Sequence, residues 1–244
     1  LVGSENVYKR QLADTIIIGK GIGIDAMAAL NIILPLFNIF FGTGLLFGVG
    51  GSVLMSIARG KGDTQTGNCY FSVAVLLNAI TCILYMILFL NFMEPIARFL
   101  GATDVTMPYV LNYAPYVIWG LSFFAFSTFL QTFVRNDGAP KLSMIAVVSG
   151  GVLNVVLDIV FVFPCKMGMA GAAIASVLGS VLTTVILLFH FRSKSNGLHF
   201  SLKKFSPVFI TNIYKNGFTS FLVEVSSGIV TVSYTHLRAH ETSQ

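Results

Sequence analysis

Three acidic side chains lie in or beside long apolar stretches of this sequence, and they are the residues best suited to chemistry. Asp158 lies in SGGVLNVVLDIVFVF, residues 149–163, and Asp14 and Glu224 lie at the edges of two other stretches. No Lys or Arg lies inside these stretches to neutralise the acids. A charge at the centre of a bilayer costs at least about 2.5–3.5 kcal/mol, so such acids indicate a cation site, a proton relay or a substrate contact.

Asn154 and Asp158 are four residues apart, so a helix would place both on one face. The amide can donate a hydrogen bond to the ionised carboxyl, and its oxygen can help to hold a cation. A carboxyl in that setting can load a proton from one side of a membrane and release it to the other, and a cationic substrate can compete with that proton. The alternative is structural, with Asp158 capping a neighbouring helix or pairing with a residue outside this chain.

Other polar and aromatic residues are weaker candidates. Gln131, in FLQTFVRNDGAPK, is expected either to line a cavity or to make a hydrogen bond at a helix end. Tyr113, Tyr116 and Trp119 suit a cavity for a flat cation, or else packing and the membrane interface. His190 and His199 are too isolated to indicate a metal site. No nucleophile–base constellation or phosphate-binding loop is visible, so we predict neither an enzyme nor a bound cofactor beyond a coupling ion.

The composition indicates an all-α integral membrane protein. Of the 244 residues 55% are hydrophobic and 10% are charged, against about 25% charged in a soluble domain. Apolar windows of membrane-spanning length lie at residues 31–57, 69–91, 108–134, 142–163 and 168–191. A broken helix is expected at each end, over residues 12–18 and from about 217. Small residues four apart, such as Gly44 and Gly48, predict close helix packing.

The chain divides into five segments. Residues 1–11 and 233–244 do not continue the pattern beside them and are expected to be foreign, adaptor-derived sequence; genuine polar termini are the alternative. Residues 12–191 are expected to form a transmembrane bundle, residues 192–216 a basic linker, and residues 217–232 the start of a second bundle. The chain is therefore interpreted as a fragment.

The basic residues sort by loop, which argues against a nucleic-acid-binding patch despite the net charge of +5. Alternate loops carry nine Lys and Arg against three in the others. The nine are Arg59, Lys61, Arg135, Lys141, Arg192, Lys194, Lys203, Lys204 and Lys215, and the three are Lys20, Arg98 and Lys166. The positive-inside rule then predicts that the loops at 58–68, 135–141 and 192–216 are cytoplasmic, in a bacterial inner membrane.

The stretch RNDGAPKLSMIAVVSGGVLNVVLDIVFVFPCKMGMAGAAIASVLGS, residues 135–180, closely resembles the multidrug and toxic compound extrusion (MATE) family. ADTIIIGKGIGIDAMAALNIILPL and GVGGSVLMSIARGKGD also look like that family, and the resemblance covers residues 12–232. It implies the first six-helix lobe of a twelve-helix transporter, with the first helix truncated and the seventh begun. It further implies export of cationic, amphipathic drugs in exchange for H⁺ or Na⁺.

The resemblance also implies roles for individual residues. Asp14, Asn154 and Asp158 match the residues that carry proton coupling, and Ser176 and Gln131 match polar members of that network, although Gln131 stands where Asn is expected. Glu224 matches an acid that the sodium-coupled branch uses. A lipid-linked precursor flippase and a non-transporting scaffold remain the rival interpretations. The expected partners are small cationic substrates and the bilayer, with neither nucleic acid nor a protein partner predicted.

Overall fold

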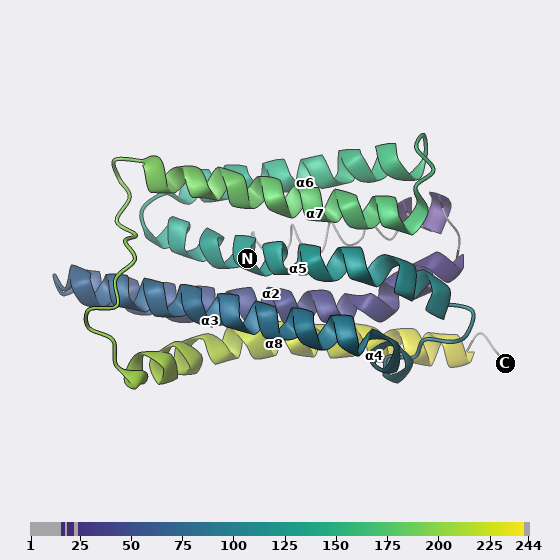
Figure 1. Ribbon diagram of the computed structural model, residues 1–244, viewed down its shortest axis with the longest axis horizontal. Helices are drawn as coiled ribbons and strands as arrows, with labels where there is room; N and C mark the ends of the chain where they lie inside the picture. The colour runs from purple at the N-terminus through teal and green to yellow at the C-terminus, as the bar shows by residue number, and fades with distance from the viewer. Residues whose placement is uncertain (1–15, 18, 22–23, 242–244) are drawn as a thin grey trace.

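The computed structural model describes residues 16–17, 19–21 and 24–241, and every regular element within them is a helix (Figure 1). The elements are α2 (Ile24–Gly60), α3 (Thr64–Asn91), α4 (Met93–Phe99), α5 (Met107–Asn136), α6 (Pro140–Val162), α7 (Gly168–Leu188), the 3₁₀ helix η1 (Phe189–Arg192) and α8 (Pro207–Glu241). Among them α2, α3, α5, α6 and α7 are long and apolar enough to cross a bilayer. The predicted all-α membrane bundle is therefore confirmed.

Short turns join consecutive helices and keep them antiparallel. Gly62 and Gly138 have φ of 81° and 86°, a conformation that glycine adopts without steric cost, and they form the α2–α3 and α5–α6 turns. Asp63 caps α3, because its Oδ1 accepts a hydrogen bond of 3.0 Å from the Thr66 N–H. Pro140 occupies the first turn of α6, where its missing N–H leaves no helical bond unmade.

The helices stack in layers, with α5 and α2 at the centre (Figure 1). The pair α6 and α7 lies on one side of α5, and α3 and α8 pack against α2 on the other. Glycines allow the central contact, since a Cβ on Gly44 would lie 2.5 Å from the Ala125 carbonyl oxygen of α5. The predicted packing role of Gly44 is thereby confirmed.

The outer faces of the bundle are apolar. Ile80, Ile83 and Leu84 of α3 are exposed, as are Val152 and Val156 of α6. Exposed aliphatic side chains in such numbers would be a liability in water, and they suit contact with lipid chains.

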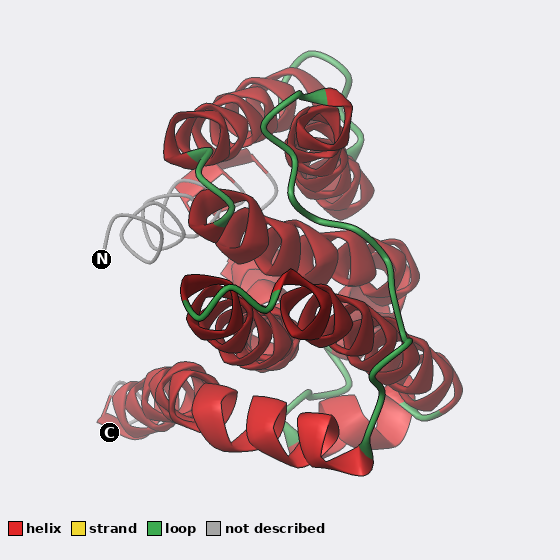
Figure 2. Cartoon of the chain, turned by 90° about the vertical axis from the view of Figure 1, so that its left-hand side faces the viewer, coloured by secondary structure: helices red, strands yellow, loops and turns green. Residues whose placement is uncertain are grey.

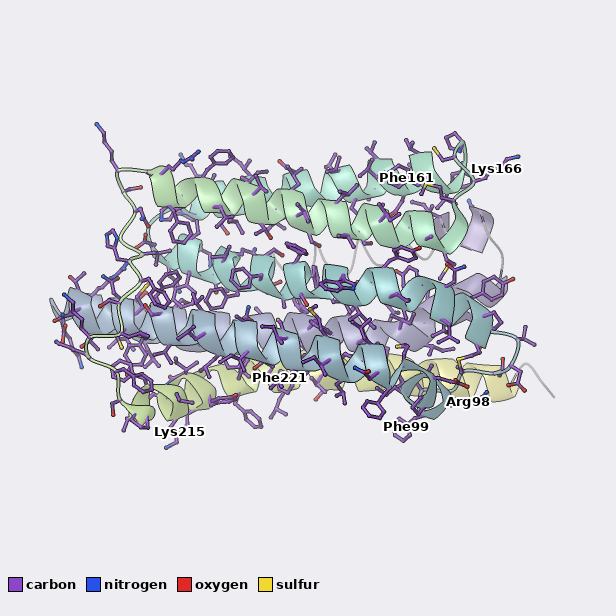
Figure 3. The ribbon with its side chains drawn as sticks, in the orientation of Figure 1. Arg98, Phe99, Phe161, Lys166, Lys215 and Phe221 are labelled. Atoms are coloured by element: carbon purple, nitrogen blue, oxygen red, sulfur yellow. The ribbon has the colours of Figure 1, made fainter. Side chains whose placement is uncertain are left out.

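One end of the molecule carries the turns at residues 61–63 and 137–139 and the irregular segment 193–206, and we call it the basic end. Lys215 lies towards this end, whereas Arg98 and Lys166 lie at the opposite end (Figure 3). Gly21 also lies opposite, because a Cβ there would meet Phe163 at the far end of α6. The two sets of loops that the sequence distinguishes are thus at opposite ends of the bundle.

Helix α8 begins at Pro207, ten residues before the expected start near 217. The polar residues Thr211, Asn212, Lys215 and Asn216 lie in residues 207–216, so this segment has no long apolar run from which a helix could be predicted. The segment is amphipathic, with the buried Ile213 on its inner face and the exposed Lys215 on the other. The irregular connection is therefore shorter than the predicted linker 192–216.

Candidate functional site

The candidate site lies between α6 and α7, which approach each other closely because glycine faces glycine. A Cβ on Gly179 would lie 2.7 Å from the Gly150 carbonyl oxygen and 2.9 Å from the Asn154 Cβ. A Cβ on Gly150 would in turn lie 2.6 Å from the Gly179 carbonyl oxygen. Contacts this short leave no room for a side chain at either position. The two glycines therefore allow the backbones of α6 and α7 to touch.

This contact brings three polar side chains together inside the bundle. Asn154 and Asp158 of α6 are buried, with 0% and 1% of their surface exposed, and Ser176 of α7 is 7% exposed. The Asn154 Nδ2 donates to Asp158 Oδ2 over 3.1 Å and to Ser176 Oγ over 3.3 Å. The predicted shared face of Asn154 and Asp158 is confirmed as a direct hydrogen bond, and we call the three residues the Asn–Asp–Ser cluster.

The cluster presents oxygen atoms in a region without bases. Its amide, carboxyl and hydroxyl oxygens are the ligand types that H⁺ and small hard cations such as Na⁺ take, and Asn154 Oδ1 accepts no hydrogen bond within the described part of the chain. Nor do the described residues contain any group of three His, Cys, Asp or Glu side chains that would hold a metal ion. The oxygen atoms of the cluster can thus accept a proton or contact a small hard cation.

A pocket adjoins the cluster and shares Ser176 with it. It lies between α2, α5 and α7 and encloses roughly 210 Å³ of empty space, including the part open to solvent. Its lining is mostly apolar and is formed by Phe37, Val117, Gly120, Leu121, Phe124, Ala173, Ser176, Val177 and Ser180. A ligand or water in this pocket would be next to the hydroxyl that Asn154 binds.

The structure does not bring Gln131 or Glu224 into this cluster. Gln131 lies at the basic end, where its backbone oxygen accepts from Ser143 Oγ over 3.2 Å. Fifteen residues of helix, or about 22 Å, separate Ser143 from Asp158. Glu224 lies on α8, on the far side of the bundle, where its Cβ would be 3.5 Å from a Cβ on Gly42. Asp14 lies outside the described residues.

The three aromatic candidates do not line one cavity. Tyr113 is 2% exposed and belongs to the hydrophobic core between the helices. Tyr116 and Trp119 are 50% and 57% exposed on another face of α5. Positions three apart turn progressively round a helix, so Tyr113 faces the core while Tyr116 and Trp119 face outward, and a substrate cavity lined by these residues stays a prediction.

Sequence reasoning missed a row of hydroxyls that continues from Ser176 along α7. Ser180 and Thr184 follow at intervals of four residues and are buried, and Thr183 lies beside them. Each donates to a backbone carbonyl of the preceding turn, over 2.9–3.0 Å. The spacing of four residues could have predicted this row, because it places Ser176, Ser180 and Thr184 on one face of α7, which adjoins the pocket and the cluster.

Comparison with known proteins decides the family. A family model described as MatE matches residues 5–160, which is more than half of the chain. The chain belongs to the MATE family. The multidrug export protein MepA of Staphylococcus saprophyticus is 28% identical over 205 residues, covering 83% of this chain and 46% of that protein. MepA of Staphylococcus aureus strain MRSA252 is 26% identical over 216 residues, covering 88% of this chain and 48% of that protein.

Solved MATE structures share the fold in two conformations. An inward-facing multidrug resistance MATE family transporter matches with a TM-score of 0.84 at 26% identity, over 91% of this chain and 51% of that one. An outward-facing one matches with a TM-score of 0.82 at 25% identity, over 93% and 51%. This MATE chain thus spans about half the length of these relatives, as expected for one of two lobes, and it matches a structure of each conformation.

Membership of the MATE family supports several predictions made from the residues. The family consists of multi-pass membrane transporters rather than enzymes, and the relatives above are named export proteins. The matched residues 5–160 include Asn154 and Asp158, while Ser176 lies beyond the matched range. The hydrogen bond between Asn154 and Ser176 nevertheless joins the two parts into one site.

Proposed function

We propose that this chain is the first lobe of a secondary antiporter that exports cationic, amphipathic compounds in exchange for H⁺ or Na⁺. The observation that carries the proposal is the Asn–Asp–Ser cluster, in which Asp158 is 1% exposed and bonded to Asn154 within an apolar bundle. A membrane protein keeps a buried acid of this kind for ion or substrate contact, because its cost to insertion is several kcal/mol.

The coupling follows from the two states of the Asp158 side chain. When a proton or Na⁺ occupies the cluster, the carboxyl is neutralised and the lobe interior has no net charge. When the ion leaves, the carboxylate attracts a cationic substrate to the same region. Alternating access of two lobes then exchanges one cation for the other, provided that the inward and outward states differ in affinity for each.

The sidedness also follows from charge. The basic end carries Arg59, Lys141 and Lys194 with the other bases of its loops, and Arg98 and Lys166 are at the opposite end. We place the basic end in the cytoplasm of a bacterial cell, and the plasma membrane as the site of action.

A flippase for lipid-linked precursors is less well supported. Such a protein binds a pyrophosphate headgroup, which calls for Arg or Lys in its cavity. In helices α2, α3, α5, α6 and α7, Lys and Arg occur only in the turns nearest the basic end. The pocket beside Ser176 is lined by apolar and hydroxyl side chains.

Efflux of ethidium from pump-deficient cells that carry the complete transporter tests the proposal. We expect wild-type cells to expel the dye and cells with Asp158→Asn to retain it at equal expression. Asp104→Asn is the matched control, because it makes the same chemical change on a side chain that is 91% exposed in the loop before α5. Undiminished efflux by Asp158→Asn would contradict a coupling role, and no efflux by wild type would contradict export of this class of compound.

A further inference from the structure

A buried ionic cluster at the basic end has no place in the function described so far. Asp137, in the turn between α5 and α6, has a side chain that is only 4% exposed. It accepts hydrogen bonds from Arg59 Nη1 at the end of α2, from His190 Nε2 over 2.7 Å, and from the Gly197 N–H over 2.8 Å. One carboxylate in the α5–α6 turn therefore joins the end of α2 to the residues that follow α7, 53 to 78 positions away in the sequence.

Arg59 also binds Gly197 directly. Its Nη2 donates to the Gly197 carbonyl oxygen and, over 3.0 Å, to Asn68 Oδ1 of α3. The Gly197 residue thus gives its N–H to an anion and its C=O to a cation, so both of its backbone polar groups are held by opposite charges. Burying such charges is costly, and a network of this kind stabilises one arrangement over its alternatives.

Gly197 belongs to the irregular segment 193–206 that leads from α7 to α8, which we call the strap. Figure 2 shows this strap as a long loop that crosses the end of the bundle, from the α7 side to the start of α8. Two further contacts hold it there. The Ser201 N–H donates to the buried Ser72 Oγ over 2.7 Å, and Lys204 Nζ pairs with Asp63 Oδ2 over 2.9 Å.

The start of α8 is fixed to the same helices. The rings of Phe209 and Tyr70 lie 4.4 Å apart, and Asn212 Nδ2 donates to the Tyr70 hydroxyl over 3.3 Å. Further along, a Cβ on Gly217 would lie 2.7 Å from the Leu46 carbonyl carbon of α2. The strap and the first turns of α8 therefore form one continuous attachment to the first lobe.

We propose that Asp137 is a positioning residue for transport, which locks the strap and the first turns of α8, Pro207 to Gly217, onto the first lobe. A free strap of 14 residues would span about 20 Å on average and let the lobes move independently. An anchored strap makes the first turns of α8 move with the first lobe when the two lobes rock. This inference rests on the proposed transport function for its consequence, although not for the anchor itself.

Gly197→Val tests the anchor without removing a charge. A Cβ on Gly197 would lie 2.8 Å from Asp137 Oδ1 and 3.0 Å from Arg59 Nη1, so a valine disrupts the bonds between Gly197 and these two side chains while every charge stays present. Gly60→Val is the matched control, because a Cβ there meets nothing within 4 Å. Ser201→Pro is a second variant, which removes the N–H donated to Ser72 and loosens the strap at another point.

Trypsin cleavage of the complete transporter at Lys194, Lys203 and Lys204 reports the attachment of the strap. We expect Gly197→Val and Ser201→Pro to be cut on the order of ten-fold faster than wild type and Gly60→Val. Cleavage as slow as wild type in both variants would overturn the anchor. This comparison needs no transport activity, so it remains decisive even if the wild type fails to export dye.

Dye binding and dye efflux separate positioning from a merely structural role. We expect both strap variants to bind ethidium with unchanged affinity while their maximal efflux rate falls roughly ten-fold, because the anchor acts on the movement of the lobes and not on the site. Faster cleavage with an undiminished efflux rate would show a passive tether and overturn the positioning role. Loss of binding and efflux together would also contradict it.

Discussion

The glycine contact between α6 and α7 makes a quantitative prediction for Gly179→Ala. The new Cβ would lie 2.7 Å from the Gly150 carbonyl oxygen and 2.9 Å from the Asn154 Cβ, where ordinary contacts are 3.4 Å or longer. Both neighbours are backbone or the base of a side chain, so α6 and α7 must separate. Overpacking of this kind costs about 1–3 kcal/mol of folding free energy. The Asn154–Ser176 hydrogen bond, already 3.3 Å long, would be broken by the same movement.

Gly151→Ala supplies the control for this prediction, because a Cβ at Gly151 meets nothing within 4 Å. Both substitutions gain the same helix propensity, about 1 kcal/mol, so their difference isolates the contact. We expect the Tm of the purified complete transporter to be lower for Gly179→Ala than for Gly151→Ala by roughly 2–10 °C. Dye efflux should fall for Gly179→Ala alone. Equal Tm values for the two variants would refute the reasoning that this contact assembles the site.

Two further predictions concern stability. Hydrogen bonds from the Thr66 N–H and then from Lys204 hold the pKa of Asp63 well below its usual 3.8, so its contribution is present above that pH and is lost as the pH falls through the lowered value. Thermal unfolding should show Asp63→Ala less stable than wild type at pH 7, with a narrower gap at pH 3, where the unfolded chain already binds a proton at Asp63 in most molecules; a gap that widens at pH 3 would contradict this. Asn78 is fully buried in α3, and neither of its side-chain polar atoms has a hydrogen-bond partner within the described residues. Asn78→Leu should therefore stabilise the protein by about 1–3 kcal/mol and raise the Tm by a few degrees, whereas a lower Tm would contradict a destabilising amide.

Local pattern predicted the helices and the central pair of the site. Hydrophobic runs of membrane length located all five spans, because a helix in lipid satisfies its own backbone and needs no neighbour to define its bounds. A spacing of four residues likewise sufficed for Asn154 and Asp158, since both lie on one helix and their contact depends only on helical geometry.

Contacts between helices were beyond the reach of such patterns. Gln131 and Glu224 look like members of the same network, but the order of helices in the bundle places one at the basic end and the other on α8. The bonds from Asp137 to His190 and Arg59 join residues 53 and 78 positions apart, so no local spacing in the sequence predicts them. His190 looked isolated for the same reason, although its side chain is buried against a carboxylate.

The cluster and the anchor occupy the two ends of one helix pair. Ser176 and His190 are 14 residues apart, about 20 Å along α7 and its 3₁₀ extension, and no described ion pair or side-chain hydrogen bond links them directly. Any influence of the cluster on the strap must therefore pass through movement of α7 itself. The Gly150–Gly179 contact ties α7 to α6 near the cluster, and Asp137 ties both helices to α2 at the basic end. A tilt of the α6–α7 pair would therefore move the cluster and the anchor together, because the packing that assembles the site also holds these helices to the strap.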